Sequence, residues 1–206
     1  MPTEPATHPQ VAPATLAQWR ELSSVLASAF YEDPVFGWLL PDDSTRAVAL
    51  QRFFAIETRR IVLRHGRSVA IARGPETVGT ALVLPPGSWR TPISVQAICG
   101  PRYMQIFGRR LPHALGVLTH MERRHARHPH IYFAYIGVAA ATQSQGLGTA
   151  LLAPVLERCD REGVPAYLEA SNARCARLYE RLGFETVETI RPFGSPPIQL
   201  MSRRPG

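Results

Sequence analysis

The chain has 206 residues, a length that suits one large domain, and 45% of them are hydrophobic, which is enough apolar material for a buried core. Only 19% are charged, so the composition excludes a disordered polyelectrolyte. The longest uncharged apolar run, residues 131–141, is far shorter than the roughly 20 residues that a membrane-spanning helix needs. Residues 1–15 lack the cationic start and apolar stretch of a secretory signal, so the sequence predicts a cytoplasmic protein with no membrane partner.

The net charge is +7, and all 23 basic residues are arginine. This bias indicates either a surface for anions such as nucleic acid or the codon usage of a GC-rich genome. The arginine pairs are dispersed without interleaved aromatics, which favours codon usage and makes nucleic acid an unexpected partner. The three cysteines, Cys99, Cys159 and Cys175, lack C-x-x-C spacing, so we expect buried free thiols and no metal site.

The first part of the chain is predicted to be helical and to end in a β-hairpin. Thr15 and Gln18 form a capping box, and apolar residues then recur at helical spacing. Asp33-Pro34 begins a second helical stretch, and Gly74-Pro75 is a turn between two apolar runs. The expected elements are a loose tail over 1–13 that ends in an edge strand at 10–12, helices over 15–30, 34–40 and 44–65, and hairpin strands over 67–72 and 78–84.

The remaining sequence divides into an irregular section and a periodic one. Prolines at 92, 101 and 112 are expected to cut residues 89–130 into short helices, with one longer helix over 113–126, and ligand pockets are often built from such inserts. Strands and helices then alternate, which implies parallel pairing through right-handed crossovers and an α/β sheet. The expected elements are strands over 131–138, 166–170, 185–190 and 198–202 and helices over 146–162 and 173–182.

A loop with two glycines joins the strand over 131–138 to the next helix. Gly146 and Gly148 have no Cβ, so successive backbone N–H groups at this helix N-terminus can close around a pyrophosphate. Leu151 replaces the third glycine of a GxGxxG motif, and no Gly-Lys-Ser/Thr follows, so dinucleotide and nucleoside triphosphate sites are disfavoured. The alternative is a loop whose glycines only tighten the turn between strand and helix.

Later residues complete a larger pattern. Gln143, Gly146 and Gly148 form Q-x-x-G-x-G, Tyr179 follows Asn172 by seven residues, and Gly183-Phe184 comes next. Together they resemble the GNAT superfamily of N-acetyltransferases over about residues 131–184. Within this superfamily the chain is most similar to the puromycin N-acetyltransferases, at residues 29–34, 137–138, 163–166, 179–184 and 201–203.

The resemblance implies a single domain over 14–206, with a mixed central β-sheet flanked by helices. Residues 131–184 would be its parallel βαβα half, which binds acetyl-CoA as co-substrate and carries out catalysis. The cofactor-binding residues that the resemblance implies are Ile136, Gly137, Val138, Gln143, Ser144, Gln145, Gly146, Leu147, Gly148, Thr149 and Asn172.

Two residues receive catalytic roles. By resemblance Tyr179 would protonate the departing CoA sulfur, and a phenol with a pKa of about 10 is suited to that transfer; the alternative is a core aromatic. Glu169 closes the strand over 166–170, so it is well placed to deprotonate the amine, directly or through water. The alternative for Glu169 is an ion pair with Arg174 or Arg177.

The expected function is therefore acetyl transfer to the primary amine of a small molecule, with an antibiotic such as puromycin among the candidates. The alternatives are a protein N-acetyltransferase and a non-catalytic acyl-CoA-binding or nucleic-acid-associated regulator, and the chain is expected to be a monomer or homodimer. The spacing of His120, His125, His128 and His130 could indicate a metal cluster, but the first two lie on a charged helix face among arginines, so a solvated surface is expected instead. Aromatic residues that could line an acceptor pocket are Tyr31, Phe36, Trp38, Trp89, Tyr103 and Phe107.

Overall fold

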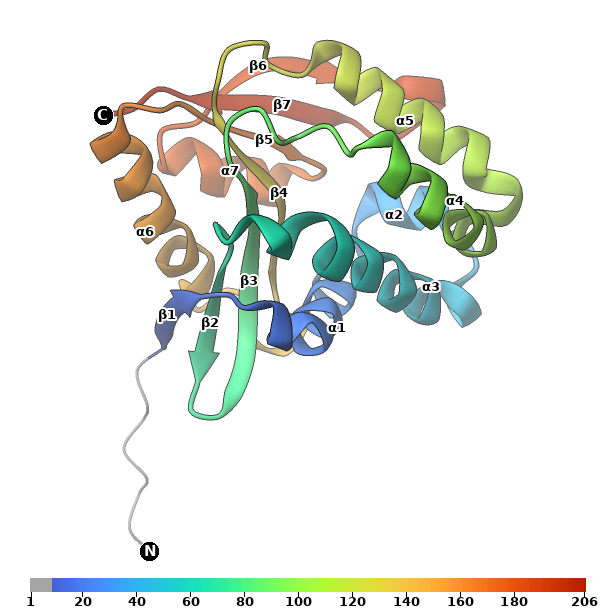
Figure 1. Ribbon diagram of the computed structural model, residues 1–206, viewed down its shortest axis with the longest axis horizontal. Coiled ribbons are helices and arrows are strands. Elements are labelled where there is room, and N and C mark those ends of the chain that lie inside the picture. Colours follow the sequence, from blue (N-terminus) through green and yellow to red (C-terminus); the bar gives the residue numbers. More distant parts are fainter. Residues whose placement is uncertain (1–8) are drawn as a thin grey trace, which may run out of the picture.

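In the computed structural model, which describes residues 9–206, a seven-stranded mixed sheet carries helices on both faces (Figure 1). The first eight residues of the predicted loose tail lie outside the described residues. The strand order is β1-β2-β3-β4-β5-β7-β6, in which β4 and β5 are parallel and all other neighbours antiparallel. The predicted α/β fold is therefore confirmed. The strands are β1 (Gln10–Pro13), β2 (Val69–Arg73), β3 (Glu76–Leu84), β4 (Ile131–Val138), β5 (Ala166–Ala170), β6 (Glu185–Ile190) and β7 (Ile198–Arg203).

The helices follow the predicted order, with one correction. Pro101 was expected to interrupt the chain, but α4 continues through it, because the packing of Cys99, Ile106 and Phe107 against the core outweighs the local cost of proline. Pro112 lies in the first turn of α5, where proline is tolerated. The helices are α1 (Trp19–Ala29), α2 (Pro34–Leu39), α3 (Asp43–Ile56) with a π-helical segment after it (Glu57–Val62), α4 (Ile93–Phe107), α5 (Leu111–Arg124), α6 (Leu147–Glu162) and α7 (Ala173–Arg181).

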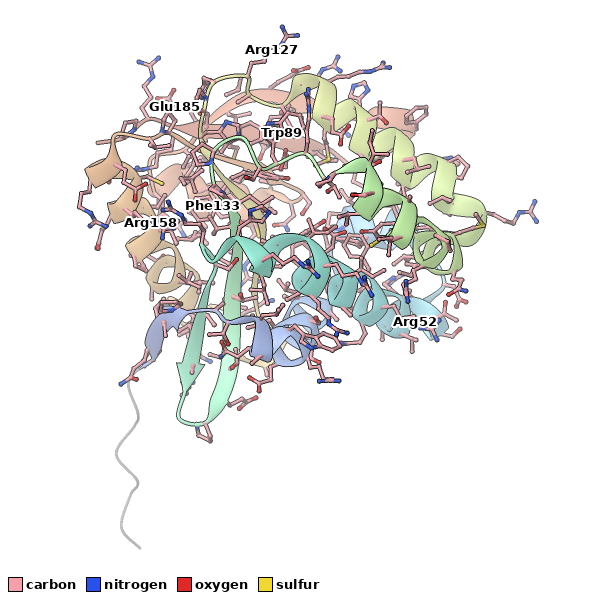
Figure 2. The ribbon with its side chains drawn as sticks, viewed as in Figure 1. Arg52, Trp89, Arg127, Phe133, Arg158 and Glu185 are labelled. Atoms are coloured by element: carbon pink, nitrogen blue, oxygen red, sulfur yellow. The ribbon has the colours of Figure 1, made fainter. Side chains whose placement is uncertain are left out.

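Strand residues alternate between two hydrophobic cores. Leu82 and Leu84 pack with residues of α1, α3, α4 and α5, whereas Ala81 and Val83 pack with residues of α6 and α7. This alternation follows from the two-residue period of a strand, and it explains why the central strands are apolar throughout. In Figure 2, Phe133 of β4 lies in the interior, while Arg127 projects from the surface.

The sheet opens between β4 and β5. The two strands pair only from Ile131 to Phe133 of β4, and beyond that point β4 pairs with β3 alone. The register between β3 and β4 shifts after Leu82, so that Tyr132 and Tyr135 both face the core of α1 to α5 although they are three residues apart. Parallel strands that separate at their carboxyl ends leave a crevice of the kind that binds ligands in α/β sheets.

Several smaller expectations are also resolved. The edge strand near residue 10 is confirmed as β1, and the N–H of Thr15 donates to Oε1 of Gln18 at 2.9 Å, as the capping box requires. Cys99 and Cys159 are buried free thiols as predicted, whereas Cys175 is only partly buried. Across residues 9–206, no helix has the length and apolar character needed to cross a membrane.

Candidate active site

A cavity of about 1090 Å³ extends from the opening between β4 and β5 to the helical insert. One end is lined by the glycine loop and α7, and the other by residues of α3, α4 and α5. This volume is at the upper end of the range for small-molecule sites, which suits a long ligand together with a second, smaller one.

The glycine loop has the backbone geometry of an anion site. Gly146 is the N-cap of the 16-residue helix α6 and has a φ of +77°, which favours glycine, and Ser144 also has a positive φ of +66°. Gly148 lets α6 approach α7, because a Cβ there would lie 3.1 Å from Cδ2 of Leu178. Arg174 donates to Oγ of Ser144 at 2.7 Å, which adds a cation beside the helix N-terminus. The residues present thus fit a pyrophosphate.

The predicted cofactor residues are gathered along this end of the cavity, with one exception. Ile136, Gly137 and Val138 line it from the stretch of β4 that has separated from β5. Gln145 is absent from the lining, and its side chain instead accepts a hydrogen bond from Arg73 at 2.8 Å. The predicted residues that do line the cavity are Ile136, Gly137, Val138, Gln143, Ser144, Gly146, Leu147, Gly148, Thr149 and Asn172.

The side chain of Asn172 caps the N-terminus of helix α7. Its Oδ1 accepts a hydrogen bond from the N–H of Cys175 at 2.9 Å, so the side chain caps the first turn of α7. The same side chain also hydrogen-bonds to Asp33, and the residue lines the cavity.

Tyr179 lies on α7 at the cavity wall and is 5% exposed. Burial raises the pKa of its phenol well above the usual value, so the hydroxyl keeps its proton at neutral pH and can act as a donor. The ring also packs edge-on against Phe184, with centroids 6.0 Å apart. Tyr179 therefore both packs in the core and lines the cavity.

Glu169 pairs with a histidine. Its Oε1 lies 3.5 Å from Nδ1 of His125, and both side chains are almost fully buried. Arg174 bonds to the glycine loop instead, so the alternative of a Glu169–Arg174 ion pair is wrong. Arg177 forms no ion pair with Glu169 either, among the ion pairs of residues 9–206.

The prediction of solvated histidines is wrong for two of them. His125 and His130 are 6% and 2% exposed, because α5 ends before His125 and the chain turns inward to begin β4. Trp89 stacks on His125 with ring centroids 4.1 Å apart, and it is seen over the strands in Figure 2. Helical periodicity could not reveal this burial, since it stops being informative where the helix ends.

Hydrogen bonds determine which ring nitrogens of His125 and His130 carry protons. Nδ1 of His130 lies 2.7 Å from the carbonyl oxygen of His128, which can only accept, so Nδ1 carries the proton. Burial lowers the pKa of His130 to about 4, and its neutral Nε2 therefore accepts from Nε2–H of His125 at 2.9 Å. Nδ1 of His125 is left facing the carboxylate of Glu169.

Glu57 is a further buried carboxylate, and the sequence pattern did not predict it. It is 9% exposed, lines the cavity, and accepts hydrogen bonds from the hydroxyls of Tyr103 at 2.5 Å and Tyr135 at 3.2 Å. Burial, partly offset by these hydrogen bonds, raises the pKa of Glu57 to about 7. The available signal was its place four residues after Phe53, on the buried face of the same helical stretch.

The six aromatic candidates divide into two groups. Tyr31 and Trp38 lie outside the cavity lining, where Arg46 lies over the ring of Tyr31 and His113 packs edge-on against Trp38. The candidates that do line the cavity are Phe36, Trp89, Tyr103 and Phe107. In the part of the chain that the structure describes, no group of three or more His, Cys, Asp or Glu side chains could hold a metal ion.

Comparison with known proteins identifies the fold family. The model of the acetyltransferase (GNAT) family matches residues 19–184. An uncharacterized N-acetyltransferase of Schizosaccharomyces pombe is 24% identical over 203 residues, covering 91% of this chain and 80% of the relative.

Solved structures of acetyltransferases are similar to this chain over nearly its whole length. Histone acetyltransferase HPA2 and related acetyltransferase from Corynebacterium glutamicum is 28% identical, with a TM-score of 0.75 over 96% of this chain and 97% of its own. Polyamine N-acetyltransferase from Drosophila melanogaster shares the fold at 16% identity, with a TM-score of 0.64 over 96% of this chain and 100% of its own. With its family match, its mixed sheet opened between β4 and β5 and its glycine loop, the chain belongs to the GNAT family of N-acetyltransferases.

Proposed function

We propose that this enzyme transfers the acetyl group of acetyl-CoA to the primary amine of a small molecule. The observation that carries the proposal is the single cavity that connects the glycine loop, Tyr179 and Glu169. The cavity thus joins an anion site for the CoA pyrophosphate to a proton donor and a proton acceptor.

The proposed chemistry needs three actions from this chain. Glu169, supported by His125, accepts a proton from the ammonium form of the acceptor, and the neutral nitrogen then attacks the thioester carbonyl carbon. Backbone N–H groups of residues 136–138 donate to the carbonyl oxygen as it gains negative charge. Tyr179 donates its proton to the sulfur as the carbon–sulfur bond breaks, and the second proton that the nitrogen loses restores the tyrosine hydroxyl, so that the products are a neutral amide and the free CoA thiol.

A small acceptor is supported by the position of α4 and α5, whose residues line the cavity opposite the glycine loop. The Drosophila neighbour is a polyamine N-acetyltransferase, which makes polyamines natural members of a test panel. Puromycin belongs in the same panel because of the sequence resemblance described above.

The test is an assay of thiol release from acetyl-CoA across a panel of amines. The panel contains alkylamines, arylalkylamines, diamines, amino acids, puromycin and a peptide with a free N-terminus. Release that depends on a small amine, with a matching acetylated product by mass spectrometry, supports the proposal. Acetylation of the peptide alone favours a protein N-acetyltransferase, and CoA binding without turnover favours a non-catalytic binder.

A further inference from the structure

The helical end of the cavity contains a buried carboxylate with no cationic partner. Oε1 of Glu57 accepts from Tyr103, and Oε2 accepts from Tyr135. Among the ion pairs of residues 9–206, none includes Glu57. An isolated buried carboxylate costs several kcal/mol unless a cation or a proton joins it.

Three separate elements converge on this carboxylate. Glu57 begins the π-helical segment after α3, Tyr103 comes from α4, and Tyr135 is turned toward it by the register shift in β4. π-Helical turns are rare and are frequently found at functional sites. The ring centroid of Phe53 lies 5.9 Å from that of Tyr135 and 6.1 Å from that of Tyr103. The faces of such aromatic rings attract cations.

The charge of the cavity is opposite to that of the protein. The chain has 23 arginines against 16 acidic residues, yet acidic side chains predominate along the cavity wall. The two arginines of the lining, Arg174 and Arg181, both belong to α7, and Arg174 bonds to the glycine loop. The acidic residues of the lining are Glu32, Asp33, Glu57, Glu122 and Glu169.

We propose that Glu57 binds a second, non-reacting cationic nitrogen of the acceptor, so that the substrate class is a diamine, or an amine that carries another cation on an apolar spacer. This inference rests on the proposed function, in which the reacting nitrogen is delivered to Glu169. Glu57, Tyr132 and Glu169 all line the same cavity. One acceptor with two nitrogens can therefore meet both groups, with its apolar spacer against the aromatic wall.

The experiment compares α,ω-diaminoalkanes of three to eight carbons with monoamines of the same length, using acetyl-CoA and the full chain. The wild-type enzyme is expected to prefer the best diamine over its monoamine at least about tenfold in kcat/KM. Glu57→Gln keeps the shape of the side chain and removes its charge, so KM for that diamine should rise about 10- to 100-fold with kcat changed less than about threefold. Glu157→Gln, an exposed charge change on α6, is the matched control and should retain the preference.

Two outcomes overturn the inference. A wild-type enzyme that acetylates monoamines as well as diamines has no second cation subsite. A Glu57→Gln enzyme that loses kcat equally with both amine series identifies Glu57 as the proton acceptor instead. Calorimetric binding of the diamines to both variants needs no turnover, so it tests the subsite even where thiol release, and with it the proposed function, fails.

Discussion

Ser171, which directly follows β5, donates its hydroxyl hydrogen bond to Oδ2 of Asp33, the N-cap of α2. Oδ1 of the same carboxylate accepts from the N–H groups of Val35 and Phe36 at 2.9 and 3.1 Å. One side chain near the N-terminus thus caps a helix and holds the segment after β5 beside the cavity, and burial raises its pKa.

Asp33→Ala should lower the free energy of unfolding by roughly 2–3 kcal/mol, because it removes a cap and leaves the hydroxyl of Ser171 without its acceptor. Asp42 caps α3 in the same way but is exposed, so Asp42→Ala should lower the free energy of unfolding by less. Urea denaturation of both variants provides the comparison. Equal losses of unfolding free energy in the two variants would show that the contact with Ser171 adds nothing to stability.

Glu57→Gln should stabilise the protein at pH 8. Burial raises the pKa of Glu57 from 4.5 to about 7, so the folded protein binds this proton more tightly than the unfolded chain does. Stability from this group is complete below pH 4.5 and is lost as the pH rises to about 7, on the order of 3 kcal/mol in all. Glutamine has no such loss. The melting temperatures of the two proteins should therefore coincide near pH 4, diverge between pH 4.5 and about 7 and stay apart above pH 7, and parallel curves over this range would contradict a raised pKa.

Gly146→Val should abolish the rise in Tm that CoA causes in the wild-type protein. The φ of +77° strains any residue with a Cβ, and the added side chain occupies the space in which the phosphates would lie. Gly163→Val is the control, because this glycine ends the same helix with a φ of +66° and open space around it. Gly163→Val should lower the Tm about as much as Gly146→Val does, but its Tm should still rise when CoA is added. Absence of a CoA shift in the wild-type protein would end the assignment of the loop.

Tyr179→Phe should lower kcat by about 10²–10⁴-fold while leaving the Kd for CoA nearly unchanged, because its hydroxyl acts only as the carbon–sulfur bond breaks. The ring and its contact with Phe184 are retained. Tyr31→Phe, outside the cavity lining, is the control for loss of a tyrosine hydroxyl. Unchanged kcat with a normal melt would leave Tyr179 as a packing residue only.

Glu169→Gln should flatten the rising limb of the pH profile of kcat/KM, since this limb reports loss of the proton that blocks the base or the amine. His125→Asn should change the same profile, because the imidazole lies 3.5 Å from this carboxylate. Stopped-flow or steady-state rates from pH 5 to 10 measure both effects. Identical profiles for wild type and His125→Asn would confine the histidine to a packing role.

The sequence by itself determined most of the fold and the glycine-loop end of the cavity. The apolar runs at residues 131–138 and 166–170 predicted β4 and β5, and both strands were found at the predicted bounds. The glycine loop and the position of Asn172 before α7 could also be predicted from the sequence, because backbone conformation and capping depend on residues within a few positions of one another.

The tertiary structure alone decided the helical end of the cavity. Glu57, Tyr103 and Tyr135 come from three elements and meet only when α3, α4 and β4 pack together. Likewise, the pairing of Glu169 with His125 joins β5 to the end of α5 across 44 residues of chain. Local periodicity carries no information about such encounters, because burial of a polar side chain is set by which distant surfaces cover it, and here that burial created both the carboxylate–histidine pair and the acidic subsite.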